Sequence, residues 1–575
     1  MTIASLRTHW PRAFFLSAAV TFAACSQGNP TDQSGRGSAS TGGSTGGSNT
    51  GGTSASGGTP ASGGTSASGG TPASGGTSAS SGGTSASSGG TSASSGGTSA
   101  SSGGTAASGG LTSTGGVASS GGSSSTGGVT SSGGVTKQGG STAAGGSTGG
   151  TTGAGGATGA GGVIAVTGLP AKADVLASMR SANDWFMTKH PDPSAAIVTD
   201  KSRPSNLWTR ATYQEGLNAL YGVETDATKK SSYYAYGAKW GDSHTWGMAS
   251  TTGTAASDNA DNQACGQAYI DLYNIGAANG DKQANRLTAI TASIKGMVSS
   301  GVTSSNKWWW IDAIHMSMPS FIKLGVLNND TTYFDGAWVM YNDARTKEGG
   351  GLWNATDGLW FRDLHYTPSG GTATPMTAAI HSGLINGTPD KTTDAYIVAP
   401  NGKGLYWSRG NGWVVAALVR VLDILPTTDS HRATYVADFQ AQMRALIALQ
   451  RTDGFWNESL MDPTHCKSIG LDGDDGPETS GTTFFTYGLA WGIRKGLLDA
   501  ATYSAPMQKA WNGLSTVALQ KDGLLGYTQS SGDRPCTEDT QKAGRLGPTT
   551  LANFDDYGVG GFLLAGSEVY QLAGN

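Results

Sequence analysis

The sequence predicts an all-α fold in which six inner and six outer helices alternate along the chain, the arrangement of an (α/α)6 barrel. Two kinds of helical segment alternate over residues 164–575, and runs with the apolar/polar alternation of β-strands are almost absent there. A third observation limits the foldable part, because residues 26–163 cannot build a core. A barrel differs from an irregular helical bundle only in closure, so helix periodicity alone leaves the bundle as an alternative.

The first 25 residues have the composition of an export signal, with two arginines ahead of an apolar run over residues 13–24. This run is well short of the roughly 20 residues that span a bilayer. The Phe22-Ala23-Ala24-Cys25 sequence resembles a bacterial lipoprotein signal, which implies cleavage before Cys25 and lipidation of that residue. An ordinary signal peptide is the alternative. In lipoproteins, Ser26 after the cysteine implies transport to the outer membrane, so we expect an exported protein with a lipid anchor there, at the cell surface or in the periplasm.

Residues 26–163 have the composition of a disordered linker. They contain about half of the chain's 92 glycines, no Phe, Tyr or Trp, and only three charged side chains. Such a stretch has too little apolar surface to offset the entropy of ordering its backbone. Because Gly/Ser-rich chains behave as flexible coils, this linker would span roughly 65 Å root-mean-square. Residues 164–575 remain as one large domain.

Six segments of this domain are amphipathic with charged faces, as outer-layer helices are. They cover residues 171–190, 226–236, 281–299, 331–346, 431–451 and 500–518. Between them lie six segments rich in aromatic and small residues, which we expect to be buried on most sides. These inner segments cover residues 208–221, 261–273, 310–324, 407–425, 480–493 and 556–570.

The charge of the chain excludes several classes of partner. Its formal net charge is −4 and its isoelectric point is about 6.1, with no basic stripe, which argues against a nucleic-acid partner. No His/Cys cluster has metal-site spacing, and no glycine-rich turn between a strand and a helix indicates a nucleotide, so we expect no metal and no cofactor. Residues 471–476 superficially resemble a calcium loop but lack its full spacing, so we expect a solvated acidic loop.

The cysteines have two expected roles. Export places them in an oxidising compartment. Cys466 and Cys536 lie in polar, loop-like sequence where they could form a disulfide, whereas Cys265 lies in a helical pattern and is expected to be a buried thiol.

Several inner segments begin with polar residues that an apolar core would not hold without a purpose. If the inner helices run parallel, their starts converge at one mouth of the barrel, where carboxylates beside indoles suit a sugar ring. The candidate residues at these starts are Asp261, Asp312, Trp310, Trp407, Arg409 and Trp413.

Asp312 is the side chain that we expect to act as an acid, although an N-cap is the simpler role for an Asp at a helix start. Residues 308–310 are three consecutive tryptophans. A carboxyl beside apolar rings loses solvation of its charged form, so its pKa rises. If Asp261 faces the same pocket, the shared charge raises one pKa further and leaves the other carboxyl ionised, which divides the acid and base roles.

Five motifs follow one another in the folded part. They are Ala-Asp-Asn-x-x-x-Gly-Gln-x-Tyr from residue 260, Trp-Trp-Trp-Ile-Asp-Ala from 308, Trp-Ser-Arg-Gly-Asn-Gly-Trp from 407, Glu-Thr-Ser-Gly-Thr from 478, and the glycine-rich stretch 557–570. Together they resemble glycoside hydrolase family 105, the unsaturated rhamnogalacturonyl hydrolases, and more distantly the unsaturated glucuronyl hydrolases of family 88. The resemblance covers residues 171–572 and implies the (α/α)6 barrel.

This resemblance implies hydration of a double bond rather than attack at an anomeric carbon. The family's substrates are acidic oligosaccharides, made by lyases, that carry a 4,5-unsaturated uronic acid at the non-reducing end, and rhamnogalacturonan of the pectin type is the expected source. Asp312 matches the family's proton donor to C4. Asp261 matches the second acidic position, which orients water and stabilises the cationic transition state.

The resemblance also assigns substrate contacts. Arg409 and Trp413 match positions where a guanidinium binds the uronate carboxylate and an indole stacks on the ring, and Trp407 and Trp310 are expected beside them. A structural ion pair is the other role that a buried Arg409 could have.

The chain departs from the family at two places. It has Asn262 where members often carry a second Asp. Members also carry a His in the segment that corresponds to residues 358–363, and here Arg362, Asp363 or His365 would serve instead. This segment is expected to shape the subsite of the sugar that follows the uronate.

Two other classes of function are alternatives to hydration. One is an inverting glycosidase or a polysaccharide lyase, because such barrels also use paired carboxylates in aromatic clefts. The other is a non-catalytic surface lipoprotein that binds glycans. Asp312, Arg409 and Trp413 together argue against the second class, because binding alone does not need a buried acid.

Overall fold

The computed structural model describes residues 168–198, 202–249, 258–300, 307–368, 371–383, 395–471, 475–536, 547–548 and 555–573. All of them belong to a unit that runs from Gly146 to Asn575. The expected lipidation site at Cys25 and the expected linker over residues 26–163 lie outside the described residues. Within the described ranges, no helix combines the length and the apolar character that crossing a membrane requires.

Six inner helices form a closed ring. Each packs against the next in chain order, and the sixth packs against the first. They are α2 (Trp208–Val223), α5 (Cys265–Ala278), α7 (Asp312–Asn328), α10 (Ser408–Ile424), α13 (Thr479–Arg494) and α16 (Asp556–Leu572). Closure distinguishes an (α/α)6 barrel from an irregular bundle, so the fold predicted from the sequence is confirmed.

The ring closes tightly between α2 and α16 because glycines face each other there. A Cβ atom added to Gly216 would overlap the backbone of Gly560, and one added to Gly560 would overlap the backbone of Thr212 and Tyr213. The glycine-rich composition of residues 557–570 therefore has a packing reason, since only glycine allows the two backbones to come this close.

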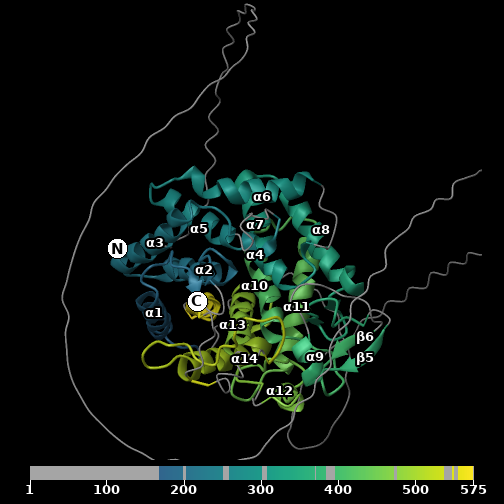
Figure 1. Cartoon of the computed structure of the whole chain (residues 1–575). Helices are drawn as coiled ribbons and strands as arrows, with labels where there is room; N and C mark the ends of the chain where they lie inside the picture. The colour runs from purple at the N-terminus through teal and green to yellow at the C-terminus, as the bar shows by residue number, and fades with distance from the viewer. Residues whose placement is uncertain are drawn as a thin grey trace, which may run out of the picture. The chain divides into compact units, whose positions relative to one another are not determined.

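Six outer helices surround the ring. α1 packs on α16, α3 on α2, α8 on α7, α11 on α10 and α14 on α13, while α6 packs on both α7 and α8. Their bounds are α1 (Lys172–Lys189), α3 (Ala227–Ser243), α6 (Thr288–Ser299), α8 (Thr332–Thr346), α11 (Arg432–Ala448) and α14 (Ala500–Gly513). Figure 1 shows α3, α6 and α8 outside α2, α5 and α7. Asp226 and Asp499, at the N-caps of α3 and α14, accept hydrogen bonds from the backbone N–H groups of the first turn.

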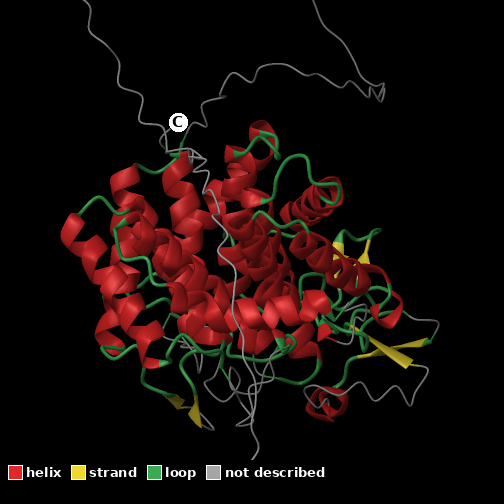
Figure 2. Cartoon of the chain, turned by 90° about the horizontal axis from the view of Figure 1, so that it is seen from above, coloured by secondary structure: helices red, strands yellow, loops and turns green. Residues whose placement is uncertain are grey.

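Three pairs of short strands lie in the connections between helices. β1 (Ile197–Val198) pairs antiparallel with β2 (Ser202–Arg203), and β3 (Trp353–Asn354) pairs antiparallel with β4 (Leu359–Trp360). β5 (Thr372–Pro375) pairs parallel with β6 (Ala395–Val398), with Thr372 opposite Ala395. Figure 2 shows these strands at the edge of the helical body. They are too short to produce a period-2 pattern, which explains why the sequence does not predict them.

The remaining helical segments are short. They are α4 (Ala260–Gln263), η1 (Ala284–Leu287), η3 (Glu348–Gly350), α9 (Ala378–Gly383), α12 (His465–Ser468) and η4 (Leu514–Ala518). α4 packs against α7, and this contact brings Asp261 to the start of the third inner helix.

Candidate active site

A cavity of about 480 Å³ lies at the end of the barrel where inner helices begin. Three carboxylates, two guanidinium groups and three indoles line it, from Asp261, Asp312, Asp533, Arg203, Arg362, Trp208, Trp309 and Trp310. Trp208 and Asp312 are the first residues of α2 and α7, so the expected convergence of helix starts is observed. A cavity with apolar walls and a few convergent charges is the common form of a site for a small polar ligand.

Asp312 lies inside the first turn of α7 rather than at its N-cap, which is Ile311. The N-cap position is therefore held by Ile311, and the Oδ2 atom of Asp312 is buried with no hydrogen-bond partner within the protein. Burial raises the pKa of Asp312, and the charges of Arg362 and Arg409 oppose that rise.

The pKa of Asp261, in α4, is strongly raised. Burial, together with the negative charge of Asp312, raises the pKa of Asp261 to about 7, while Arg362 opposes the change. The sequence predicts one raised and one ordinary carboxyl, with Asp312 the raised one. In the structure both pKa values are raised, and the negative charge of Asp312 contributes to the rise at Asp261.

Arg362 lies beside Asp312 because two chain segments pair there. The backbone N–H of Ile311 donates to the carbonyl of Arg362 at 3.0 Å, and Trp310 bridges to Asp363. The Arg362 Nε is 3.9 Å from Asp312 Oδ2. Both atoms are buried, and neither makes a hydrogen bond within the protein. Arg362 therefore acts on Asp312 through charge rather than through a hydrogen bond.

Asp363 and His365 support Arg362 from outside the cavity. Asp363 accepts a hydrogen bond from the Arg362 guanidinium at 2.6 Å and another from His365 Nδ1 at 2.8 Å. Burial would raise the pKa of Asp363, but His365 and Arg362 together lower it, and the hydrogen bond with Asp363 raises the pKa of His365. Neither side chain lines the cavity, and through Asp363 both hold the Arg362 guanidinium in position.

Arg409, Trp407 and Trp413 are buried beneath the cavity. The Arg409 guanidinium lies over the rings of Trp407 and Tyr557, at 4.5 and 4.9 Å, and donates to backbone carbonyls of residues 529–532. Trp413 packs on Phe484 and His315, with ring centroids 4.5 and 4.9 Å apart. None of the three has more than 2% of its surface exposed, so the expectation that they touch a sugar is not met by the structure.

The sequence of the chain matches that of a known protein family. The family model of Glycosyl Hydrolase Family 88 matches residues 178–380 and 390–573, well over half of the chain. The chain belongs to Glycosyl Hydrolase Family 88.

Two relatives of this family 88 chain are unsaturated 3S-rhamnoglycuronyl hydrolases. The one from Formosa agariphila is 30% identical over 265 residues, which cover 46% of this chain and 58% of the relative. The one from Alteromonas sp. is 29% identical over 270 residues, which cover 46% of this chain and 51% of the relative. The matches thus span little more than half the length of either relative.

Two solved structures share the fold of the family 88 chain. A glycosyl hydrolase family 88 protein from Bacteroides vulgatus superposes with a TM-score of 0.55 at 27% identity, covering 70% of this chain and 100% of that one. A protein described as a polysaccharide lyase superposes with a TM-score of 0.54 at 28% identity, covering 70% of this chain and 97% of that one.

Several cavity residues of this family 88 chain escaped the sequence prediction. Trp309 belongs to the tryptophan triplet from which only Trp310 was selected, and Trp208 opens the first inner segment. Asp533 lies in a polar loop with no periodic pattern, and Arg203 belongs to a two-residue strand. Of these residues, only the two tryptophans could have been predicted from the sequence. Trp208 opens the first inner segment, and Trp309 directly precedes the third.

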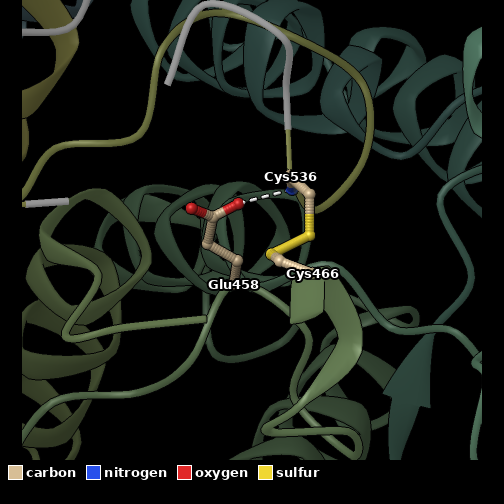
Figure 3. A group of neighbouring side chains, drawn as sticks. All are labelled: Glu458, Cys466 and Cys536. Carbon is tan, nitrogen blue, oxygen red and sulfur yellow. Dashed lines mark hydrogen bonds between the residues drawn. A yellow bond between two sulfur atoms is a disulfide. The ribbon is translucent and has the colours of Figure 1, made fainter. Parts of the chain in front are cut away.

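Other clusters of the family 88 chain have a structural role. Within the described ranges, Glu458, Cys466 and Cys536 have the composition of a metal site. Cys466 and Cys536 form a disulfide, as the sequence expected, so their sulfur atoms are not available as thiolates (Figure 3). Cys265 is a buried thiol, also as expected. Asp475, near the end of the acidic loop, is buried and accepts hydrogen bonds from the backbone N–H groups of His465 and Cys466, whereas residues 472–474 of that loop lie outside the described residues.

Proposed function

We propose that this family 88 protein releases a 4,5-unsaturated uronic acid from the non-reducing end of lyase-generated oligosaccharides by hydrating the C4=C5 double bond. The observation that carries the proposal is the pair of partly exposed carboxyls, Asp261 and Asp312, whose pKa values are both raised in a cavity lined by indoles. Such a pair supplies one proton donor and one carboxylate near neutral pH, which are the two groups that hydration of a vinyl ether needs.

Arg362 binds the carboxylate of the uronic acid. It is the guanidinium that lines the cavity next to Asp312, and the Asp363 carboxylate holds it in place at 2.6 Å. Its rigid, planar group suits a carboxylate partner. Trp309 and Trp310 pack on the sugar ring. Pairing with the uronate cancels the charge of Arg362, which lowers the pKa of Asp312, so substrate binding favours the protonated form of Asp312.

The chemical step then moves one proton in and one out. Asp312 donates its proton to C4, and the electron pair of the double bond forms the new C4–H bond. Positive charge develops on C5 and on the ring oxygen, where the remaining carboxylate stabilises it. Water adds to C5 and gives a proton back to the carboxyl pair. The ring opens, and the hemiacetal left at C1 expels the second sugar.

Two substrate types compete for the second position. The relatives named as unsaturated 3S-rhamnoglycuronyl hydrolases support a 3S-rhamnose there. The motif resemblance described above supports rhamnogalacturonan fragments of the pectin type. Residues 358–363 are the segment expected to shape this position, and Arg362, at its end, binds the uronate on the other side.

One ultraviolet assay tests the proposal against its rivals. The full chain is mixed with unsaturated 3S-rhamnoglycuronyl or rhamnogalacturonyl oligosaccharides, and the absorbance of the conjugated C4=C5 bond is followed, with Asp312→Asn as the inactive control. Loss of absorbance with the wild type alone supports hydration. A gain of absorbance from saturated polymer would support a lyase, the activity that one solved relative's description names. No change with either substrate would contradict hydration and leave an inverting glycosidase or glycan binding, which release of reducing ends from saturated polymer would distinguish.

We also propose that the enzyme works from the outer membrane, held by lipid on Cys25 and separated from it by the linker over residues 26–163. The Phe22-Ala23-Ala24-Cys25 sequence and the composition of the linker support this proposal. Incorporation of labelled palmitate into the wild type, and its loss in Cys25→Ser, is the expected result. Equal labelling of both would contradict it.

A further inference from the structure

Residues 531–533, which follow η4 in the chain, form one wall of the cavity. Ser531, Gly532 and Asp533 line the cavity from this segment, so it supplies the third carboxylate of the site. The segment belongs to neither layer of helices, and its position therefore depends on what anchors it.

Arg409 is the first anchor. Its Nη1 donates to the carbonyl of Gln529 at 3.1 Å, and its Nη2 donates to the carbonyls of Ser530 at 2.9 Å and Gly532 at 3.4 Å. The guanidinium is fully buried and reaches the backbone of three residues at once. A lysine could not do the same, because its ammonium group is a compact point charge rather than a planar fork.

Glu458 and the disulfide are the second anchor. The side chain of Gln529 donates to Glu458 Oε2 at 2.7 Å, and the backbone N–H of Cys536 donates to the same oxygen at 2.6 Å. Both ends of segment 529–536 therefore meet at one carboxyl oxygen. Cys536 is also joined to Cys466, with the Cα atoms 5.5 Å apart (Figure 3).

We propose that segment 529–536 is a substrate-binding wall that presents Asp533 to hydroxyl groups of the second sugar, and that Arg409 is the positioning residue that holds this wall. The inference rests on the proposed function for its substrate and on the contacts above for its mechanism. Asp533 accepts a hydrogen bond from Arg534 Nη1 at 2.6 Å, which fixes its carboxylate, and it determines specificity because that carboxylate also accepts hydrogen bonds from hydroxyls. Arg409 holds the wall in place, and Arg409→Lys keeps the positive charge that acts on Asp312.

The test uses two arginines of one helix. Arg409→Lys is compared with Arg420→Lys, about three turns further along α10, whose guanidinium binds Gln267 and Asp271 instead. Hydrogen exchange of the full chain without substrate is measured first. We expect faster exchange of residues 529–536 in Arg409→Lys and an unchanged rate there in Arg420→Lys. The double variant Cys466→Ser, Cys536→Ser should loosen the same segment from its other end, which covers the case in which Arg409→Lys does not fold.

Kinetics then separate positioning from a general loss of structure. We expect Asp533→Asn and Arg409→Lys each to raise KM by about fivefold or more with a smaller change in kcat. The double variant Arg409→Lys, Asp533→Asn should have nearly the KM of Arg409→Lys alone, because Asp533 no longer reaches the substrate once the wall has moved. Asp533→Glu should recover part of the lost affinity.

Two results would overturn the inference. One is wild-type exchange of residues 529–536 in both anchor variants. The other is an effect of Asp533→Asn on KM that is the same in the wild-type and Arg409→Lys backgrounds. If the wild type does not act on unsaturated oligosaccharides, the proposed function fails, and the exchange measurement still decides whether Arg409 holds the wall.

Discussion

Charge at three residues sets the chemistry of the cavity. Asp261 and Asp312 compete for a proton, and Arg362 lowers the pKa of both. The sequence predicts that the carboxyls of Asp261 and Asp312 face one pocket. Their pKa values, however, depend on where the guanidinium of Arg362 lies. Arg362 reaches Asp312 only because the backbone of Ile311 pairs with that of Arg362, more than 50 positions along the chain.

Replacing Asp312 by Asn should abolish turnover and leave substrate affinity within about tenfold, because the change removes a proton donor and keeps the shape. Turnover is followed by loss of the double-bond absorbance, and affinity by calorimetry with the same oligosaccharide. Turnover near that of the wild type would remove Asp312 from the mechanism.

Arg362→Gln should move the pH dependence of kcat/KM. In the wild type, kcat/KM is expected to fall as pH rises through about 7, where Asp261 loses its proton, since the pKa of Asp261 is about 7. Arg362 opposes protonation of both carboxyls, so its removal raises both pKa values and shifts this fall to higher pH, by about 1 unit. Arg362→Lys keeps the charge and should shift the profile less. An unmoved profile in Arg362→Gln would mean that this guanidinium does not act on the pair.

The helices of the fold could be predicted from the sequence more completely than its other elements. The twelve helices of the barrel were predictable because the inner ones combine aromatic and small residues while the outer ones have charged faces. The strand pairs were not, because two to four residues cannot display a period. Asp261, Asp312, Trp310 and Arg362 were recognised and do line the cavity. Asp533 had no signal, and the burial of Arg409 depends on a loop more than 100 residues away, which no local pattern encodes.

Two glycines of α2 provide a matched comparison. Gly216 faces the backbone of Gly560 so closely that a Cβ would overlap it, whereas Gly222 has no neighbouring atom within 4 Å of where its Cβ would be. We expect Gly216→Ala to destabilise the protein by about 1–3 kcal/mol. Gly222→Ala should stabilise it by about 0.5–1 kcal/mol, because alanine favours the helix. Thermal unfolding of the full chain measures both changes, and a lower melting temperature for Gly222→Ala alone would refute the assigned seam.

The first outer helix, α1, contacts the last inner helix, α16, and so connects the two ends of the folded domain. Asp555, directly before α16, accepts hydrogen bonds from Lys189 at 2.6 Å and His190 at 3.0 Å, at the end of α1. Burial would raise the pKa of Asp555, but His190 and Lys189 lower it to about 2. The ionised form therefore stabilises the folded protein.

Acid should weaken this junction in a defined range. An unfolded Asp has a pKa near 4, so the contribution of Asp555 is complete above about pH 5 and is lost as pH falls toward 2. The melting temperature of Asp555→Asn should be below that of the wild type at pH 6, and the difference should shrink at pH 3. Asp184→Asn, which removes an exposed ion pair with Lys229, should change little at either pH. A constant difference for Asp555→Asn would assign its effect to something other than charge.

Closure of the ring also determines when the protein can finish folding during its synthesis. α2 ends at Val223, and the helix that completes the ring beside it begins only at Asp556. At about 5–20 residues per second, a ribosome needs on the order of 20 to 60 seconds to make the intervening chain. Throughout that time, the surface of α2 that α16 will cover is exposed to water or is bound by a chaperone. Nascent chains of this protein should therefore depend on chaperones until the final helix emerges, and incomplete chains should be prone to aggregate.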